Sequence, residues 1–152
     1  MLFRSHGSVF YHAIEEGLVD PRRMVQVGIR SPMPRTVYDW LLGKGVTVMM
    51  SETVHEAGPA ATASEIRRVI GDAPAYLSFD IDALDPAFAP GTGTPEVGGL
   101  ATWQVQAILR RLRGIRFRGM DVVEVAPPYD QAEITALAAA TIVWEYLSLV
   151  AP

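Results

Sequence analysis

Two apolar periodicities alternate along the chain. Short runs rich in Val, Ile, Met and Phe predict buried strands, and longer segments with apolar residues three and four positions apart predict amphipathic helices. The predicted strands cover residues 24–29, 46–50, 75–80 and 117–125. The predicted helices cover residues 8–17, 34–44, 63–71, 102–112 and 131–150. Strands that alternate with helices of this length predict an α/β fold with a parallel sheet covered on both faces.

Two of the predicted helices carry a start signal. Thr62 stands three residues before Glu65, and Asp130 stands three residues before Glu133. In this spacing the first side chain caps free backbone N–H groups, and the acid reaches back to the capping residue. We therefore expect helices to begin near these two positions.

The segment 83–99 breaks both periodicities and predicts a long loop. Its prolines and glycines are Pro86, Pro90, Pro95, Gly91, Gly93, Gly98 and Gly99. Loops of this length are uncommon in compact domains and are often functional. We expect this loop to form the rim of a site that begins at Asp82.

Composition narrows the class of protein. The 152 residues are 49% hydrophobic and 20% charged with a net charge of -4, which predicts one globular domain over residues 1–152. A mildly acidic chain has no electrostatic preference for nucleic acid, and no apolar run is long enough to cross a membrane. The absence of cysteine excludes disulfides and zinc-thiolate sites and fits a cytoplasmic protein.

Two carboxylates, Asp80 and Asp82, stand where the predicted strand 75–80 ends. Residues two apart in a strand lie on the same side, and neighbouring like charges repel each other unless a cation lies between them. Ligands bind outside the carboxyl ends of parallel strands. The position indicates a metal site, although Asp-x-Asp pairs also cap helices or order turns. Asp85, which precedes a proline, is interpreted as a turn device.

A third candidate acid, Glu124, stands near the end of the predicted strand 117–125. Because parallel strands end at one edge of the sheet, we expect Glu124 to lie at the same edge as Asp80 and Asp82. A carboxylate there can bind a planar cation through two parallel hydrogen bonds. Asp121 lies deeper in the strand and is interpreted as a hydrogen-bonded structural acid.

One histidine, His6, precedes the first predicted helix within the segment Ser-His-Gly-Ser. A histidine can transfer protons near neutral pH, yet chain ends are where disorder concentrates. The residues around His6 therefore give it no role by themselves.

Three long segments resemble the ureohydrolase family, which includes arginases and agmatinases, and the likeness is closest to bacterial agmatinases. They are SFDIDALDPAFAPGTGTPEVGGL at 78–100, GMDVVEVAPPYDQAEITALAAAT at 119–141 and SHGSVFYHAIEEGLVDPRRMVQVGIR at 5–30. The resemblance implies a three-layer α-β-α fold with a mainly parallel sheet. It also implies manganese-dependent hydrolysis of a guanidino compound, with agmatine giving putrescine and urea.

The resemblance assigns a role to each candidate residue. Asp80 would bridge two Mn²⁺ ions and Asp82 would bind one of them. Glu124 would hold the substrate guanidinium, and His6 would assist proton transfer. Carboxylate oxygens suit Mn²⁺, and a pair of divalent ions can activate a bridging water to hydroxide.

The chain also departs from the family pattern. Gly-Gly-Asp-His and Asp-Ala-His-x-Asp segments supply further metal ligands in the family, upstream of the position of His6, and neither occurs here. The chain therefore resembles the C-terminal half of a ureohydrolase domain, with the N-terminal part of the sheet missing and a sheet edge left exposed.

Three functions remain open at this point: an agmatinase-like hydrolase, a hydrolase of guanidinobutyrate, and a non-catalytic half that requires a partner chain. We expect a small-molecule guanidino substrate and no nucleic-acid or membrane partner. A homo-oligomer or a complex with an N-terminal-half partner is the expected assembly.

Overall fold

The computed structural model of this chain describes residues 5–151, apart from the side chain of His6. The strands are β1 (Val25–Ile29), β2 (Thr47–Met50), β3 (Pro74–Asp80) and β4 (Arg116–Val123). The α-helices are α1 (Val9–Glu15), α2 (Arg35–Lys44), α3 (Ser51–Ile70), α4 (Thr102–Arg110) and α5 (Ile134–Val150). Short 3-10 helices are η1 (His6–Ser8), η2 (Pro21–Arg23), η3 (Ile81–Ala83) and η4 (Pro127–Tyr129). All four predicted strands are thus confirmed, with ends that differ by one or two residues.

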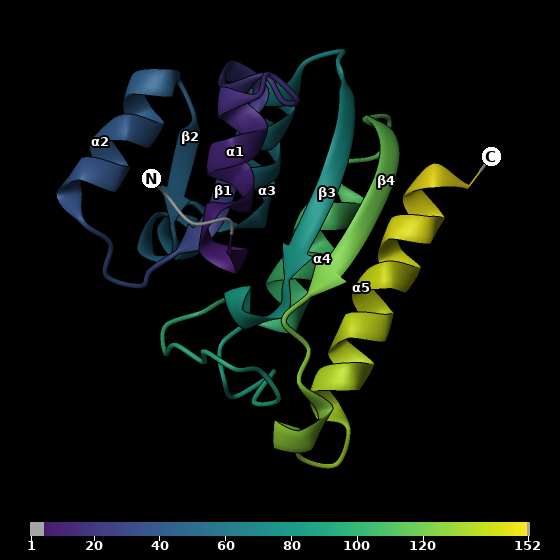
Figure 1. The fold of residues 1–152 in the computed structure, drawn as a ribbon. Helices are drawn as coiled ribbons and strands as arrows, with labels where there is room; N and C mark the ends of the chain where they lie inside the picture. Colours follow the sequence, from purple (N-terminus) through teal and green to yellow (C-terminus); the bar gives the residue numbers. More distant parts are fainter. Residues whose placement is uncertain (1–4, 152) are drawn as a thin grey trace.

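The strands form two parallel pairs. β1 pairs with β2 and β3 pairs with β4, and within residues 5–151 no ladder joins one pair to the other. Figure 1 shows the strands across the molecule in the order β2, β1, β3, β4. The parallel α/β fold is therefore confirmed. The expected unpaired strand edge is not confined to the outer strands, because β1 and β3 also lack a partner on one side within residues 5–151. The sheet is interrupted in its middle, between β1 and β3.

The two strand pairs nevertheless end at the same side of the molecule. A Cβ atom built on Gly28, near the end of β1, would lie 3.9 Å from Cβ of Ala83, just after β3. Such contact requires the carboxyl ends of β1 and β3 to be neighbours. Functional residues that follow these strands can therefore meet.

Helix α3 is longer than predicted. It covers Ser51–Ile70 and is interrupted at Gly58, whose φ of 74° precedes Pro59. Thr62 lies inside the helix, where its hydroxyl donates to the Gly58 carbonyl at 2.9 Å. The expected start at Thr62 is therefore wrong, because the chain is helical on both sides of Gly58 and the second helical segment begins directly after Gly58, before Thr62.

Helix α5, in contrast, begins later than predicted, at Ile134 instead of residue 131. Ala132 and Glu133 have left-handed φ values of 51° and 59° and form a turn. Asp130 still caps the helix, since its carboxylate accepts from the N–H groups of Thr135 at 2.9 Å and Ala136 at 3.0 Å. Asp130 is the capping residue, as predicted. The prediction that the Glu133 side chain reaches back to Asp130 is wrong, because Glu133 lies in the turn before the helix.

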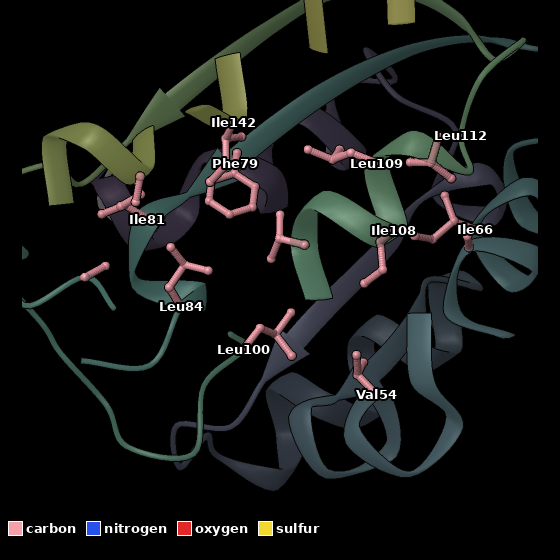
Figure 2. Packing of buried hydrophobic residues seen from close by; sticks show 14 of the residues in the cluster. Val54, Ile66, Phe79, Ile81, Leu84, Leu100, Ile108, Leu109, Leu112 and Ile142 are labelled. Atoms are coloured by element: carbon pink, nitrogen blue, oxygen red, sulfur yellow. The ribbon is translucent and has the colours of Figure 1, made fainter. Parts of the chain in front are cut away.

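A small hydrophobic cluster around Ile14, Leu41 and Val46 packs α1 and α2 beside β2, and a larger cluster holds the strands together with α3, α4 and α5. Figure 2 shows side chains from β3, η3, α3, α4 and α5 meeting in it, among them Phe79, Ile81, Val54, Ile108 and Ile142. Burial of each such side chain contributes about 1.5–3 kcal/mol. Ile81 is 0% exposed and lies between the two acids of the Asp-x-Asp pair. The core therefore anchors the turn that carries both carboxylates.

In the described part of the chain, no helix combines the length and the apolar character that a bilayer-spanning segment needs.

Candidate metal and substrate site

The Asp80–Asp82 pair lies where β3 ends. Asp80 is the last residue of the strand, and Asp82 lies in the 3-10 turn η3. The Asp82 N–H donates to Oδ1 of Asp80 at 3.1 Å, so Asp80 caps this turn. The two acids are neighbours as expected, but the stated reason is wrong: a turn brings them together, since the strand has already ended at Asp80.

The pKa of Asp80 is raised by its surroundings at the end of β3. Burial first, and then the negative charges of Asp82 and Glu124, raise this pKa to about 7, against the lowering effect of the hydrogen bond from the Asp82 N–H. A carboxylate whose charge is disfavoured by burial and by neighbouring acids is one that a cation would stabilise.

Glu124 follows β4 directly. In the parallel ladder Asp80 stands opposite Val123, so Glu124 is the next residue beyond the partner of Asp80. The segment after it is held by a hydrogen bond of 2.8 Å from the Ala126 N–H to the Gly91 carbonyl. Glu124 thus belongs to the same sheet edge as Asp80.

The backbone of Glu124 is strained. Its φ is 63°, which places a residue other than glycine in the left-handed region. Such conformations are sparsely populated, cost on the order of 1–3 kcal/mol and cluster at functional sites. The sequence carries no signal for this conformation, because glutamate has no preference for positive φ.

Arg30 connects the end of β1 to this site and was not identified from the sequence. Its Nη2 donates to the carbonyls of Asp82 and Glu96, both at 2.6 Å. Longer bonds run to the carbonyls of Leu84, Val97 and Gly28. One guanidinium therefore fixes both ends of the loop at 83–99 and the backbone of Asp82. The sequence could have indicated Arg30 by its position, because it directly follows an apolar strand, at the carboxyl edge where functional residues gather.

Two loop residues orient the acids and the loop. The Thr94 hydroxyl donates to Oδ2 of Asp82 at 3.1 Å, a contact that the sequence did not suggest. Asp85 accepts from the N–H groups of Ala87 at 3.0 Å, Gly98 at 2.8 Å and Gly99 at 3.1 Å. The interpretation of Asp85 as a turn device is confirmed, and its carboxylate also closes the loop.

Asp121 lies among hydrogen-bond donors within the strand pair. It accepts from the Ser78 hydroxyl at 2.7 Å and from the Tyr76 hydroxyl at 3.1 Å. Both partners come from β3, so the contacts link the two strands. The interpretation of Asp121 as a structural acid is confirmed.

The backbone of His6 lies in η1, but its side chain is outside the described residues. Its expected part in proton transfer stays a prediction.

The chemistry of the donor set fits part of a metal centre. Asp80 and Asp82 offer carboxylate oxygens, the ligands that Mn²⁺ and similar ions prefer. Within residues 5–151 and without the His6 side chain, no group of three or more His, Cys, Asp or Glu side chains is arranged to hold a metal ion. The two acids fit the ion, and a complete site needs further ligands.

Comparison with known proteins shows which family this chain is similar to. A family model described as the arginase family matches residues 3–148. The agmatinase of Chromobacterium violaceum is 53% identical over 145 residues, covering 95% of this chain and 43% of that protein. The guanidinopropionase of Pseudomonas aeruginosa is 51% identical over 148 residues, covering 97% of this chain and 46% of that protein. The crystal structure of a hypothetical agmatinase from Burkholderia thailandensis has a TM-score of 0.87 at 51% identity, covering 95% of this chain and 44% of that one.

This chain belongs to the arginase family. It spans slightly less than half the length of the relatives just named.

Proposed function

We propose that this chain carries one part of the active site of a manganese-dependent hydrolase that splits a guanidino compound into urea and an amine. Agmatine is the first candidate substrate. The names of two relatives, an agmatinase and a guanidinopropionase, support the reaction class, since both names specify a guanidino compound.

The observation that carries the proposal is the convergence of three carboxylates at one sheet edge. Asp80 and Asp82 share a hydrogen-bonded turn at the end of β3, and Glu124 stands one residue past the partner of Asp80 on β4. Three negative groups at the carboxyl edge of a parallel sheet suit the binding of cations, both a metal ion and a guanidinium.

Each residue would perform a separate task. Asp80 and Asp82 would hold the metal through their carboxylate oxygens. When bound, the metal pair supplies an activated water as nucleophile. Glu124 would pair with the planar guanidinium and orient its carbon toward the metal side of the site, and such positioning lowers the barrier by removing rotational freedom. His6 would move a proton to the departing amine.

Metal binding gives the first test, because it does not require turnover. We would titrate the chain with Mn²⁺ and measure free Mn²⁺ by electron paramagnetic resonance. The variants Asp80→Asn and Asp82→Asn should weaken binding by about tenfold or more, in the range seen when metal-site residues are removed. Asp39→Asn is the matched control, because Asp39 lies on α2 and pairs with the exposed Arg35. Equal Mn²⁺ affinity in all four proteins would contradict the assigned metal ligands.

The identity of the substrate requires a second measurement. Agmatine ends in an ammonium group, whereas guanidinopropionate and guanidinobutyrate end in a carboxylate. The 51% identity to a guanidinopropionase favours testing the acids beside agmatine. Urea release from each compound, in a preparation that contains the full set of metal ligands, would choose among them. Urea from none of the three would refute the reaction class.

The non-catalytic alternative has its own support. Two carboxylates leave most of the coordination of each ion to water, and few protein ligands give weak binding. If the chain binds Mn²⁺ weakly and releases no urea by itself, while the chain supplemented with the missing ligands does, it is one part of a divided active site. Urea release by the isolated chain at a rate unchanged by Asp80→Asn would refute both the division and the role of Asp80.

A further inference from the structure

The far end of the loop at 83–99 is held by side chains that lie outside the candidate site. Ser51 is the first residue of α3, directly after β2, and its hydroxyl donates to the Gly98 carbonyl at 2.5 Å. His55 lies one turn later on α3, and its Nε2 is 3.3 Å from the same carbonyl. The Gly98 N–H donates to Asp85 at 2.8 Å. Both backbone polar groups of Gly98 are therefore bonded to side chains.

The side chain of Gln104 determines which ring nitrogen of His55 carries the hydrogen. Gln104 lies on α4 and is 7% exposed, and its Oε1 accepts from the Ala101 N–H at 2.9 Å. Its amide nitrogen points the other way and lies 3.3 Å from Nδ1 of His55. Because an amide NH2 only donates, Nδ1 accepts, and the hydrogen of the neutral ring is on Nε2. The Nε2–H is thus directed at the Gly98 carbonyl and the Ser51 hydroxyl.

The same bonds argue against a nucleophilic role for Ser51. A serine nucleophile gives its proton to a neighbouring base. The Ser51 hydroxyl instead donates to the Gly98 carbonyl, and Nε2 of His55 already carries a hydrogen and cannot accept another. Ser51 is also only 3% exposed. These side chains are arranged to hold backbone.

The loop that is held in this way contacts one of the candidate metal ligands. Thr94, four residues before Gly98, donates through its hydroxyl to Oδ2 of Asp82 at 3.1 Å. Between these two points, Arg30 donates to the carbonyls of residues 96 and 97. A short segment that is bonded at both ends has little freedom, so the position of Gly98 governs the position of Thr94.

We propose that a clasp of three side chains positions the candidate metal ligand Asp82 through the loop. The clasp consists of Ser51, His55 and Gln104. It holds the Gly98 carbonyl and thereby keeps the Thr94 hydroxyl against the Asp82 carboxylate. The role toward the metal ligand rests on the proposed function, whereas the hold on the loop does not.

Hydrogen–deuterium exchange tests the hold on the loop. His55→Phe keeps a ring and removes both nitrogens, and Ser51→Ala removes the other donor to the Gly98 carbonyl. Glu56→Gln is the matched control, because Glu56 is an exposed neighbour on α3. Loop amides around Gly98 should exchange about fivefold faster in His55→Phe and in Ser51→Ala than in the control, as the loss of one hydrogen bond predicts. Circular dichroism would establish that each variant folds.

Nuclear magnetic resonance tests the part of Gln104. At about pH 8 histidine side chains are neutral, and two-bond ¹H–¹⁵N spectra distinguish the two tautomers. The chain has three histidines, so His55→Phe identifies the signals of His55. We expect the Nε2–H tautomer, and Gln104→Leu should shift the Nδ1 resonance because its lone pair loses a hydrogen bond. An Nδ1–H tautomer, or an Nδ1 resonance that Gln104→Leu leaves unchanged, would contradict the role of Gln104.

A double-mutant cycle on Mn²⁺ affinity tests the connection to the metal ligand. Thr94→Val removes the hydroxyl that contacts Asp82 and should weaken Mn²⁺ binding by about tenfold, as the loss of a hydrogen bond to a ligand does. His55→Phe should weaken binding by about threefold, since it loosens that contact without removing it. If His55 acts through Thr94, the double variant should bind no more weakly than Thr94→Val alone. Glu56→Gln should bind as the unaltered chain does.

Each part of the proposal has a result that would overturn it. Unchanged loop exchange in both His55→Phe and Ser51→Ala would refute the clasp. Equal Mn²⁺ affinity in His55→Phe and Glu56→Gln, or independent effects that multiply in the double variant, would refute the positioning of Asp82. If the unaltered chain bound no Mn²⁺, the proposed function and the positioning role would both be wrong, and loop exchange would still decide whether the clasp exists.

Discussion

Replacement of Arg30 by methionine should destabilise the fold strongly. The substitution keeps most of the apolar stem and removes the guanidinium that donates to the carbonyls of Asp82 and Glu96 at 2.6 Å. Hydrogen bonds to a charged group contribute about 1.5–3 kcal/mol each. Because these bonds act as one network and water re-solvates part of it, they do not add fully. We expect a loss of about 3 kcal/mol from the free energy of unfolding.

The assay is urea unfolding at 25 °C followed by far-ultraviolet circular dichroism. Arg35→Met is the matched control, because that arginine is 85% exposed and its bond to Asp39 lies on the surface of α2. Exposed ion pairs contribute about 0–1 kcal/mol. Arg30→Lys should fall between the two, since lysine keeps the charge but cannot reach several carbonyls through a planar fork.

Hydrogen–deuterium exchange separates the local effect from the global one. In Arg30→Met, amides of the loop at 83–99 should lose protection before those of α4 do. If Arg30→Met costs no more than Arg35→Met, or if the loop keeps its protection, the reasoning that the guanidinium holds the loop is refuted.

Three further predictions concern the loop and one helix. Gly99→Ala should lower the free energy of unfolding by about 1–3 kcal/mol, as overpacking does, because its Cβ would clash with the backbone nitrogen of Asp85. Gly93→Ala is the control, because a Cβ there would have nothing within 4 Å. In a urea titration, Gly93→Ala should match the wild type and Gly99→Ala should not. Gly43→Ala, also in open space but inside α2, should raise the melting temperature through a gain of about 0.5–1 kcal/mol in helix propensity; an unchanged or lower value would contradict this. The N–H of Ala87 first, against burial, and then those of Gly98 and Gly99 hold the pKa of Asp85 below its ordinary 3.8. Because the pKa is lower in the folded state, this carboxylate stabilises the fold above that value and loses its effect as pH falls through the folded pKa. The difference in urea midpoint between wild type and Asp85→Asn should therefore be largest near neutral pH and shrink below pH 3.8; a difference that grows in acid would refute the assignment.

Local chemistry explains which parts of the fold the sequence revealed. Strands β1 to β4 are short runs rich in apolar and β-branched residues, a pattern that can be recognised within a few residues, so all four were predicted. The spacing of Thr62 and Glu65 placed the start of α3 too late, because the Thr62 hydroxyl bonds to the Gly58 carbonyl within the helix and caps no helix start. The start of α5 was displaced because two residues took left-handed values that their types do not favour.

Some residues of the candidate site could be predicted from the sequence, and others could not. The positions of Asp80, Asp82 and Glu124 after predicted strands followed from the order of apolar and acidic residues. Arg30 and Thr94 were missed, because their partners are 52 and 12 residues away in the chain and no local pattern marks them. A contact between distant segments depends on how the strands are arranged in space.

By itself, the sequence determined the α/β class, the four strands and the carboxylates after β3 and β4, since the alternation of apolar and polar residues can be recognised within a few positions. Only the tertiary structure decided that the sheet is interrupted between β1 and β3, that Arg30 fixes the loop around Asp82, and that Glu124 takes a left-handed conformation. Strand pairing and guanidinium–carbonyl contacts join segments far apart in the chain, so their outcome depends on the folded molecule as a whole.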